Sequence, residues 1–235
     1  MDFNRFKLLI MLFLVIFLTA FSMFKNGERK IDFESINYLD SDFNFTSEKS
    51  VNKLLKQSDS ISLSLVKRDL NLNKLEKIIN SNVFVHSAEV SLNLEGEIGI
   101  KIIEKEPVFR VLGGKYYIDS IGDKIPLSSI FSKTIPLIVS EVDSIYFDDL
   151  GLFGNYIKND SFLSDHISGL EIIDDGFNIY VNNYSYTIKM NDLNDFKTCF
   201  RNYKVFYKSV EKDSVLDKLS SINLNFKNQV IIQKK

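Results

Sequence analysis

The sequence is poor in the residues that build covalent and metal-centred scaffolds. It has a single cysteine, Cys199, two histidines and no tryptophan. One cysteine excludes both an internal disulfide framework and a cysteine-based zinc site. Three prolines leave little material for rigid linkers. The fold must therefore be held together by apolar burial, for which the chain carries 20 Phe and 10 Tyr.

Positive and negative charges are nearly balanced in the sequence, which argues against nucleic-acid binding. A net charge of −2 gives no basic footprint of the kind that nucleic-acid binding needs. With 45% hydrophobic and 26% charged residues the chain has ordinary globular composition, and this excludes disorder throughout. A length of 235 residues suits one large domain or two small ones.

An uncharged apolar run near the start predicts a membrane segment at residues 7–24. The run covers residues 8–24 and spans about 26 Å as a helix, close to the roughly 30 Å of a hydrocarbon core. All its faces are apolar, which argues against a buried helix of a soluble protein. Ala20-Phe21-Ser22 is similar to a signal-peptide cleavage site, but the run is longer than usual signal-peptide cores. Basic residues on both sides leave the orientation open.

The next 75 residues or so alternate between strand and helix patterns. Residues 31–38 predict a strand. Helices follow at 47–56, with Val51, Leu54 and Leu55 on one side, and from an Asn71 or Asn73 cap through Asn80. Two strands with period-two alternation come next, at 88–94 and 98–102, joined by a turn at Glu95-Gly96. This order predicts two helices on one face of a small sheet.

The second half predicts a mixed, mainly antiparallel sheet. Strands are expected at 108–112, 116–118, 170–173, 177–181 and 184–190, with a helix at 144–157 weakened by its glycines. Asp174-Asp175-Gly176 predicts a hairpin turn, and Asn182-Asn183 predicts a two-residue hairpin turn. Residues 193–210 predict a long amphipathic helix with an aromatic stripe. Residues 221–233 predict one final strand.

Several motifs occur in the order typical of one protein family. Residues 82–90, NVFVHSAEV, resemble the V-x-x-A-x-V strand of a POTRA (polypeptide-transport-associated) domain. Glu104 to Val108, EKEPV, resembles its E-x-P-V close, with two residues instead of one between Glu104 and Pro107. Residues 116–122, YYIDSIG, and 222–230, INLNFKNQV, resemble the Y-x-I-D-x-x-G step and the terminal I-D-L-R-Y-x-x-Q-V strand of the FtsQ (DivIB) family. The chain departs from that family at Asn182-Asn183, Asn223 and Asn225, and it lacks the V-x-G that often ends the first strand.

This resemblance implies an α+β protein of the bacterial cell-division machinery. It implies a cytoplasmic tail (1–6), a transmembrane helix (7–24), a linker (25–30), a POTRA domain of β-α-α-β-β order (31–107) and an FtsQ-type β domain (108–235). That β domain would have antiparallel strands and a C-terminal amphipathic helix and strand. The protein would be a single-pass inner-membrane scaffold, periplasmic in its bulk and enriched at the septum. Its expected partners are FtsB-like and FtsL-like small membrane division proteins, with neither nucleic acid nor a small-molecule substrate.

The last strand is the candidate site, because a strand at a sheet edge can be extended by a partner segment. Lys227 would favour an acidic partner. The alternatives are that residues 221–233 only close the domain's own sheet, or that the protein is a POTRA-type export component that binds extended polypeptides. The expected partner-binding residues are Ile222, Leu224, Phe226, Lys227, Asn228, Gln229, Val230 and Ile231.

The sequence offers no catalytic constellation, and we expect no enzyme activity, cofactor or metal. His86 and His166 lack metal-ligand spacing; we expect His86 to be partly buried and His166 to lie in a polar loop. Cys199 falls beside the apolar stripe of the amphipathic helix and is expected to fill the core. Asp148-Asp149 and Asp174-Asp175 suit a helix face and a turn.

Overall fold

The structure, a computed structural model, describes residues 3–29, 31–39, 43–57, 66–226 and 229–235. The chain divides into two compact units, one ending at Glu104 and the other beginning at Lys105. This division lies close to the boundary expected at residue 107.

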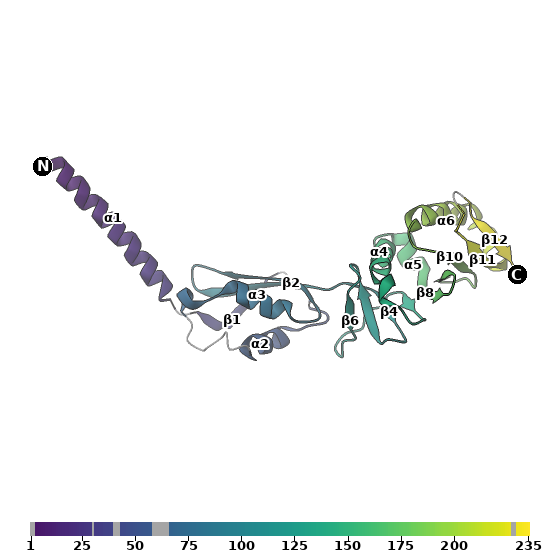
Figure 1. Cartoon of the computed structure of the whole chain (residues 1–235), viewed down its shortest axis with the longest axis horizontal. Helices are drawn as coiled ribbons and strands as arrows, with labels where there is room; N and C mark the ends of the chain where they lie inside the picture. The colour runs from purple at the N-terminus through teal and green to yellow at the C-terminus, as the bar shows by residue number, and fades with distance from the viewer. Residues whose placement is uncertain (1–2, 30, 40–42, 58–65, 227–228) are drawn as a thin grey trace. The chain divides into compact units, whose positions relative to one another are not determined.

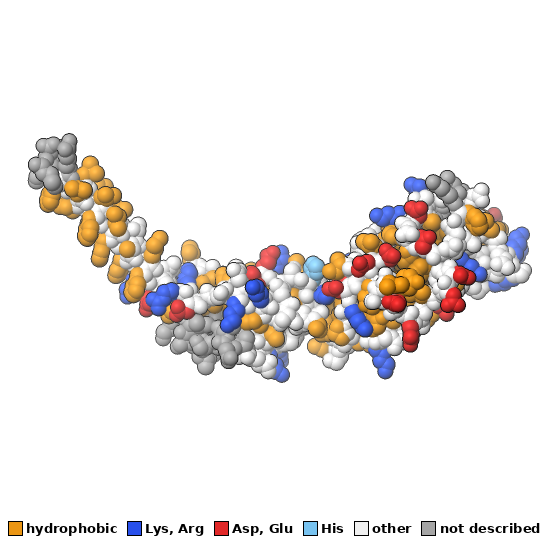
Figure 2. Space-filling view, in the orientation of Figure 1, with side chains coloured by type: hydrophobic (Ala, Val, Ile, Leu, Met, Phe, Trp, Pro, Cys, Tyr) orange, Lys and Arg blue, Asp and Glu red, His pale blue; other side chains and the backbone are white. Residues whose placement is uncertain are grey.

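The first unit begins with the long apolar helix α1 (Phe3–Gly27). Its part Phe6–Gly27, 22 residues, is long and apolar enough to cross a membrane, since it spans about 33 Å at 1.5 Å per residue. The helix continues past the expected end at residue 24 because Lys25 and Asn26 do not break a helix. Its apolar side chains from Phe6 to Phe24 are exposed in the structure, and Figure 2 shows them along the helix.

The rest of the first unit has the expected β-α-α-β-β order (Figure 1). Its three strands pair in the order β1-β3-β2, with β1 parallel to β3 and β2 antiparallel to it. Val51 and Leu55 of one helix and Leu75 and Ile79 of the other bury against the same sheet face. The elements are β1 (Asp32–Tyr38), α2 (Glu48–Gln57), the short 3-10 helix η1 (Lys67–Asp69), α3 (Leu72–Asn80), β2 (Val85–Leu92) and β3 (Glu97–Glu104).

Two local signals in this unit are confirmed, and one expected position differs. The Asn71 side chain caps α3 by accepting a hydrogen bond from the amide of Lys74. Gly96 has a positive φ of 94°, as the expected turn requires. Leu94, however, was expected on the buried face of the strand. It lies beyond the end of β2 and is exposed, because the chain has already begun to turn there.

One carboxylate fixes the segment that leads into α2. The two oxygens of Glu104 accept hydrogen bonds from the amides of Asn44, Phe45 and Thr46, at 3.0, 3.0 and 2.7 Å. The Thr46 hydroxyl donates a fourth, at 2.6 Å. The first residue of the expected E-x-P-V element therefore joins the end of β3 to the chain just before a helix distant in sequence.

The second unit is built on a nine-stranded mixed sheet of order β12-β11-β10-β9-β8-β7-β4-β5-β6. The 3-10 helices η2 (Ser144–Tyr146) and η3 (Leu216–Lys218) accompany it. The strands are β4 (Pro107–Val111), β5 (Tyr116–Asp119), β6 (Lys124–Pro126), β7 (Leu137–Ile138), β8 (Ile167–Ile173), β9 (Gly176–Val181), β10 (Thr187–Met190), β11 (Leu219–Asn223) and β12 (Ile231–Lys234), and the helices are α4 (Phe147–Lys158), α5 (Ser161–His166) and α6 (Phe196–Val210).

One buried row of side chains crosses most of this sheet at matched register. The helices α4 and α6 meet over the same core: the Phe153 ring lies 5.4 Å from that of Phe196 and 5.5 Å from that of Phe200, centroid to centroid. Gly154 lets α4 approach the sheet, since a Cβ there would stand 2.5 Å from Val108. The glycines therefore allow close packing rather than ending the helix. The buried row of side chains that crosses the sheet consists of Val111, Ile138, Leu170, Ile179, Ile188 and Ile222.

Two expected elements of this unit differ in the structure. Asn182-Asn183 was expected to be a two-residue turn, but β9 ends at Val181 and β10 begins only at Thr187. Asn183 does have the expected positive φ, 68°. Tyr186, however, lies in the same connection and is buried, so packing of this side chain in the core sets the path of the connection. The amphipathic helix begins at Phe196 instead of residue 193, and buried Leu193 precedes it.

Glu104→Ala should destabilise the first unit by about 2 kcal/mol, because it leaves three amides and a hydroxyl without their charged acceptor. Denaturant unfolding of the full chain in micelles, followed by far-ultraviolet circular dichroism, measures the loss. Glu89→Ala, at an exposed position on β2, is the matched control. Equal stability of the two variants would contradict the role given to Glu104.

Candidate partner-binding edge of the sheet

The C-terminal segment forms two strands, so the expectation of one strand over residues 221–233 is wrong. β11 and β12 run antiparallel, with Ile222 opposite Ile232 and Asn223 opposite Ile231. The reason lies in the asparagines between them. The Asn223 side chain accepts a hydrogen bond from the amide of Asn225 at 2.9 Å, a local bond that turns the chain out of the strand.

β11 lies inside the sheet and is not an edge. It pairs in parallel with β10 on one side and antiparallel with β12 on the other. Ile222 and Leu224 are consequently buried in the core. These two residues, which were expected to touch a partner, support the fold instead.

β12 is the last strand on this side of the sheet, as far as the described residues extend. The amide of Lys235 donates to the carbonyl of Lys218 at 2.9 Å, and so points inward to β11. Backbone direction alternates along an antiparallel strand. The N–H and C=O of Ile232 and the N–H of Lys234 therefore point away from the sheet.

Side chains beside this edge are partly apolar and partly or wholly exposed. Ile231 is 43% exposed and Phe226 is 49% exposed. Gln229 is exposed, and Val230 packs partly against the core. Lys227 and Asn228 lie outside the described residues. The structure thus brings Phe226, Gln229, Val230 and Ile231 of the expected set to the exterior.

The sequence pattern did not predict that Lys234 and Lys235 belong to the candidate site. Lys234 and Lys235 lie at this end of the unit, where Figure 2 shows basic side chains. The Lys235 ammonium is held by the Ser185 hydroxyl at 2.7 Å and the carbonyl of Asp217 at 2.9 Å. Two isoleucines followed by charged residues are the signal that could have marked an edge strand, since lysine is common on exposed edges.

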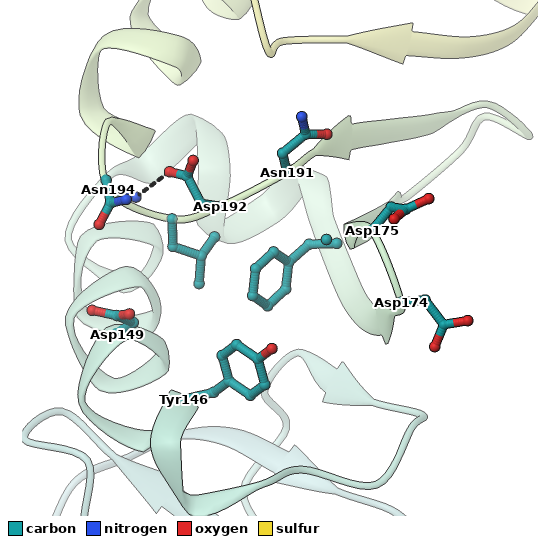
Figure 3. A pocket seen from close by; sticks show the side chains of 10 residues that line it. Tyr146, Asp149, Asp174, Asp175, Asn191, Asp192 and Asn194 are labelled. Atoms are coloured by element: carbon teal, nitrogen blue, oxygen red, sulfur yellow. Dashed lines mark hydrogen bonds between the residues drawn. The ribbon is translucent and has the colours of Figure 1, made fainter.

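A separate pocket of about 580 Å³ lies between α4, the β8–β9 turn and the segment after β10 (Figure 3). Tyr146 and Phe177 form part of its wall, and Asp149, Asp174 and Asp192 are among its acidic residues. Asp192 is engaged locally, accepting the amide of Asn194 at 2.9 Å. In the part of the chain that the structure describes, no group of three or more His, Cys, Asp or Glu side chains could hold a metal ion.

His166 lies in the core, so its expected place in a polar loop is wrong. Its Nε2 is 2.5 Å from the Tyr203 hydroxyl, which is 2.6 Å from that of Tyr186. The Phe162 ring stacks on the imidazole. Burial lowers the pKa of His166 to about 4 and raises that of Tyr203, so both are neutral at pH 7. The arrangement is a hydrogen-bonded part of the core.

The other reactive side chains also have structural surroundings. His86 is exposed on β2, not partly buried as expected. Cys199 is half-buried, and its thiol lies 3.4 Å from the carbonyl of Leu224. Burial raises the pKa of Cys199, so the thiol stays protonated and is a weak nucleophile.

Comparison with known proteins adds one finding. The family described as FtsQ/DivIB, C-terminal related, matches residues 106–232, which is more than half of the chain. The matched region takes in nearly all of the second unit, including β11 and the start of β12. No curated protein matches the sequence.

Acid should weaken the second unit through His166. The pKa of about 4 lies below the ordinary 6.5, so between these values the unfolded chain binds more protons than the folded one and stability falls as pH falls. His166→Gln should flatten this pH dependence, measured by denaturant unfolding followed by near-ultraviolet circular dichroism of the tyrosines. His86→Gln is the control. A slope unchanged by His166→Gln would contradict the prediction.

Proposed function

Because this chain belongs to the FtsQ/DivIB C-terminal related family, we propose that it is a membrane-anchored scaffold of the division machinery that recruits partners by strand addition at β12. The family gives the cell-division role, and α1 is suited to be the anchor. The scaffold acts by binding and not by catalysis.

The observation that carries this proposal is the position of β12 at the end of the sheet. Its outward N–H and C=O groups are the ones that an incoming strand would pair with. Main-chain hydrogen bonds of this kind give affinity with little demand on the partner's sequence. The neighbouring side chains must therefore supply the selectivity.

Those side chains favour an acidic strand with apolar residues. Ile231 and Phe226 offer exposed apolar surface at the edge. Lys234 and Lys235 add positive charge at the end of the unit, and Lys227 adds one more in the sequence between Phe226 and Gln229. Complementary charge raises the association rate and rejects basic competitors. We assign this site to the FtsB-like and FtsL-like membrane division proteins of the same bacterium.

The remaining parts of the proposal concern placement. Residues 31–107 act as a POTRA domain, supported by the β-α-α-β-β order and the Glu104 contact. Residues 1–6 stay in the cytoplasm, residues 7–24 cross the inner membrane, and both globular units face the periplasm at the septum. A fluorescent fusion that stays evenly distributed over the envelope during constriction would contradict this placement.

Lys234→Pro should weaken partner capture at least about tenfold, because proline removes one outward N–H and leaves the bonds to β11 in place. Lys234→Gln is the matched control, since it removes the charge but keeps the N–H. Binding is measured with the full chain in nanodiscs and the purified FtsB-like and FtsL-like proteins. Equal affinity of the proline and glutamine variants would exclude pairing through this amide.

Phe226→Ala should also weaken capture, by roughly threefold to tenfold, through loss of exposed apolar contact area. Val205→Ala, which removes an exposed apolar side chain from α6 outside this edge, is the control. The same assay with unrelated extended peptides tests the export alternative. Capture of those peptides as tight as capture of the division proteins would favour an export component.

A further inference from the structure

A groove of about 550 Å³ opens in the second unit beside the short strand β7. β7 has only two residues and joins β4 to β8 at Arg110–Val111 and Gly169–Leu170. Before β7, residues 132–136 belong to no strand, although the Pro136 carbonyl still accepts the amide of Arg110 at 3.0 Å. Residues from β4, β8 and α4 line the space that results.

Irregularities in both flanking strands accompany this opening. The register of β4 against β5 shifts between Pro107 and Phe109. That of β8 against β9 shifts between Ile167 and Gly169. Such bulges increase twist and bend a strand, and they are frequent beside binding sites. One wall of the groove is therefore part of the sheet, and the segment 132–136 forms another.

The walls of the groove combine apolar surface with positive charge. Val108, Ile157 and Ile167 are its buried apolar residues. Every charged side chain that lines it is basic, although the chain as a whole carries a net charge of −2. These residues are Arg110, Lys133 and Lys158.

Arg110 differs from the two lysines in its partners. Lys133 and Lys158 both pair with the Glu106 carboxylate, the first at 3.4 Å. Arg110 instead contacts the Ser132 hydroxyl at 3.3 Å and lies over the Tyr117 ring at 6.0 Å. Among the described residues it has no carboxylate within ion-pair distance. A half-buried guanidinium held by neutral groups is preorganised to bind a carboxylate in bidentate geometry.

We propose that this groove is a second binding site, which takes an extended acidic peptide segment of a partner protein. A carboxylate of the segment binds Arg110, and its apolar side chains cover the surface beside Ile135 and Leu137. Hydroxyl groups of Ser132 and Ser168 lie along the groove for hydrogen bonds to the peptide backbone. This site is separate from the β12 edge and does not depend on strand addition there.

The test uses the full chain in nanodiscs and a fluorescein-labelled peptide of alternating valine and glutamate, with binding followed by fluorescence anisotropy. Arg110→Gln should weaken binding about tenfold, and Lys133→Gln and Lys158→Gln less, because Glu106 already shares their charge. Ser164→Trp, at an exposed lining position, should block binding without a change of charge. Lys208→Gln on α6 is the matched control and should bind as the wild type does.

Two further arms identify the occupant. A peptide of alternating valine and glutamine should bind at least about tenfold more weakly, and inorganic phosphate at equal ionic strength should not displace the acidic peptide. Displacement by phosphate, or equal affinity for the two peptides, would overturn the proposal. So would wild-type affinity in both Arg110→Gln and Ser164→Trp. Lys234→Pro should leave this binding unchanged, which separates failure of the groove from failure of the β12 edge.

Discussion

The parallel pairing of β10 with β11 is the constraint on which the second unit depends. Parallel neighbours need a long crossover, and α6 supplies it. Figure 1 shows α6 beside β10 and β11. Its buried Phe196, Phe200 and Tyr203 fill the core that the sheet alone would leave open. This pairing places β11 inside the sheet, and β12, on its other side, is the outer strand among the described residues.

Sequence patterns predicted those parts of the fold that local physics determines. The apolar stripes of α2 and α3, the Asn71 cap and the Asp174-Asp175 hairpin needed only periodicity and turn chemistry. The prediction of one strand over residues 221–233 is wrong because the apolar residues Ile222, Leu224 and Phe226 alternate with polar ones, as they would in a single strand. Only the bond from Asn225 to Asn223, visible in three dimensions, shows where the strand ends.

The positions of isolated polar residues were less predictable still. His166 follows an aspartate in a polar stretch of sequence. In the structure it nevertheless contacts Tyr186, just before β10, and Tyr203 of α6. No pattern in the sequence brings residues 166, 186 and 203 together. The same holds for the candidate sites. The groove around Arg110 depends on a strand only two residues long, and the outward amides of β12 depend on pairing direction. Glu104 is the exception, because a family resemblance marked it and its four hydrogen bonds explain why.

The central claim is that a partner strand pairs with the outer side of β12. Hydrogen–deuterium exchange at single-residue resolution, with and without the FtsB-like and FtsL-like proteins, measures this pairing directly. The amides of Ile232 and Lys234 should exchange readily in the free protein and become strongly protected in the complex, whereas that of Lys235, already bonded to Lys218, should change little. A complex that forms while the amides of Ile232 and Lys234 remain unprotected would contradict strand addition at this edge.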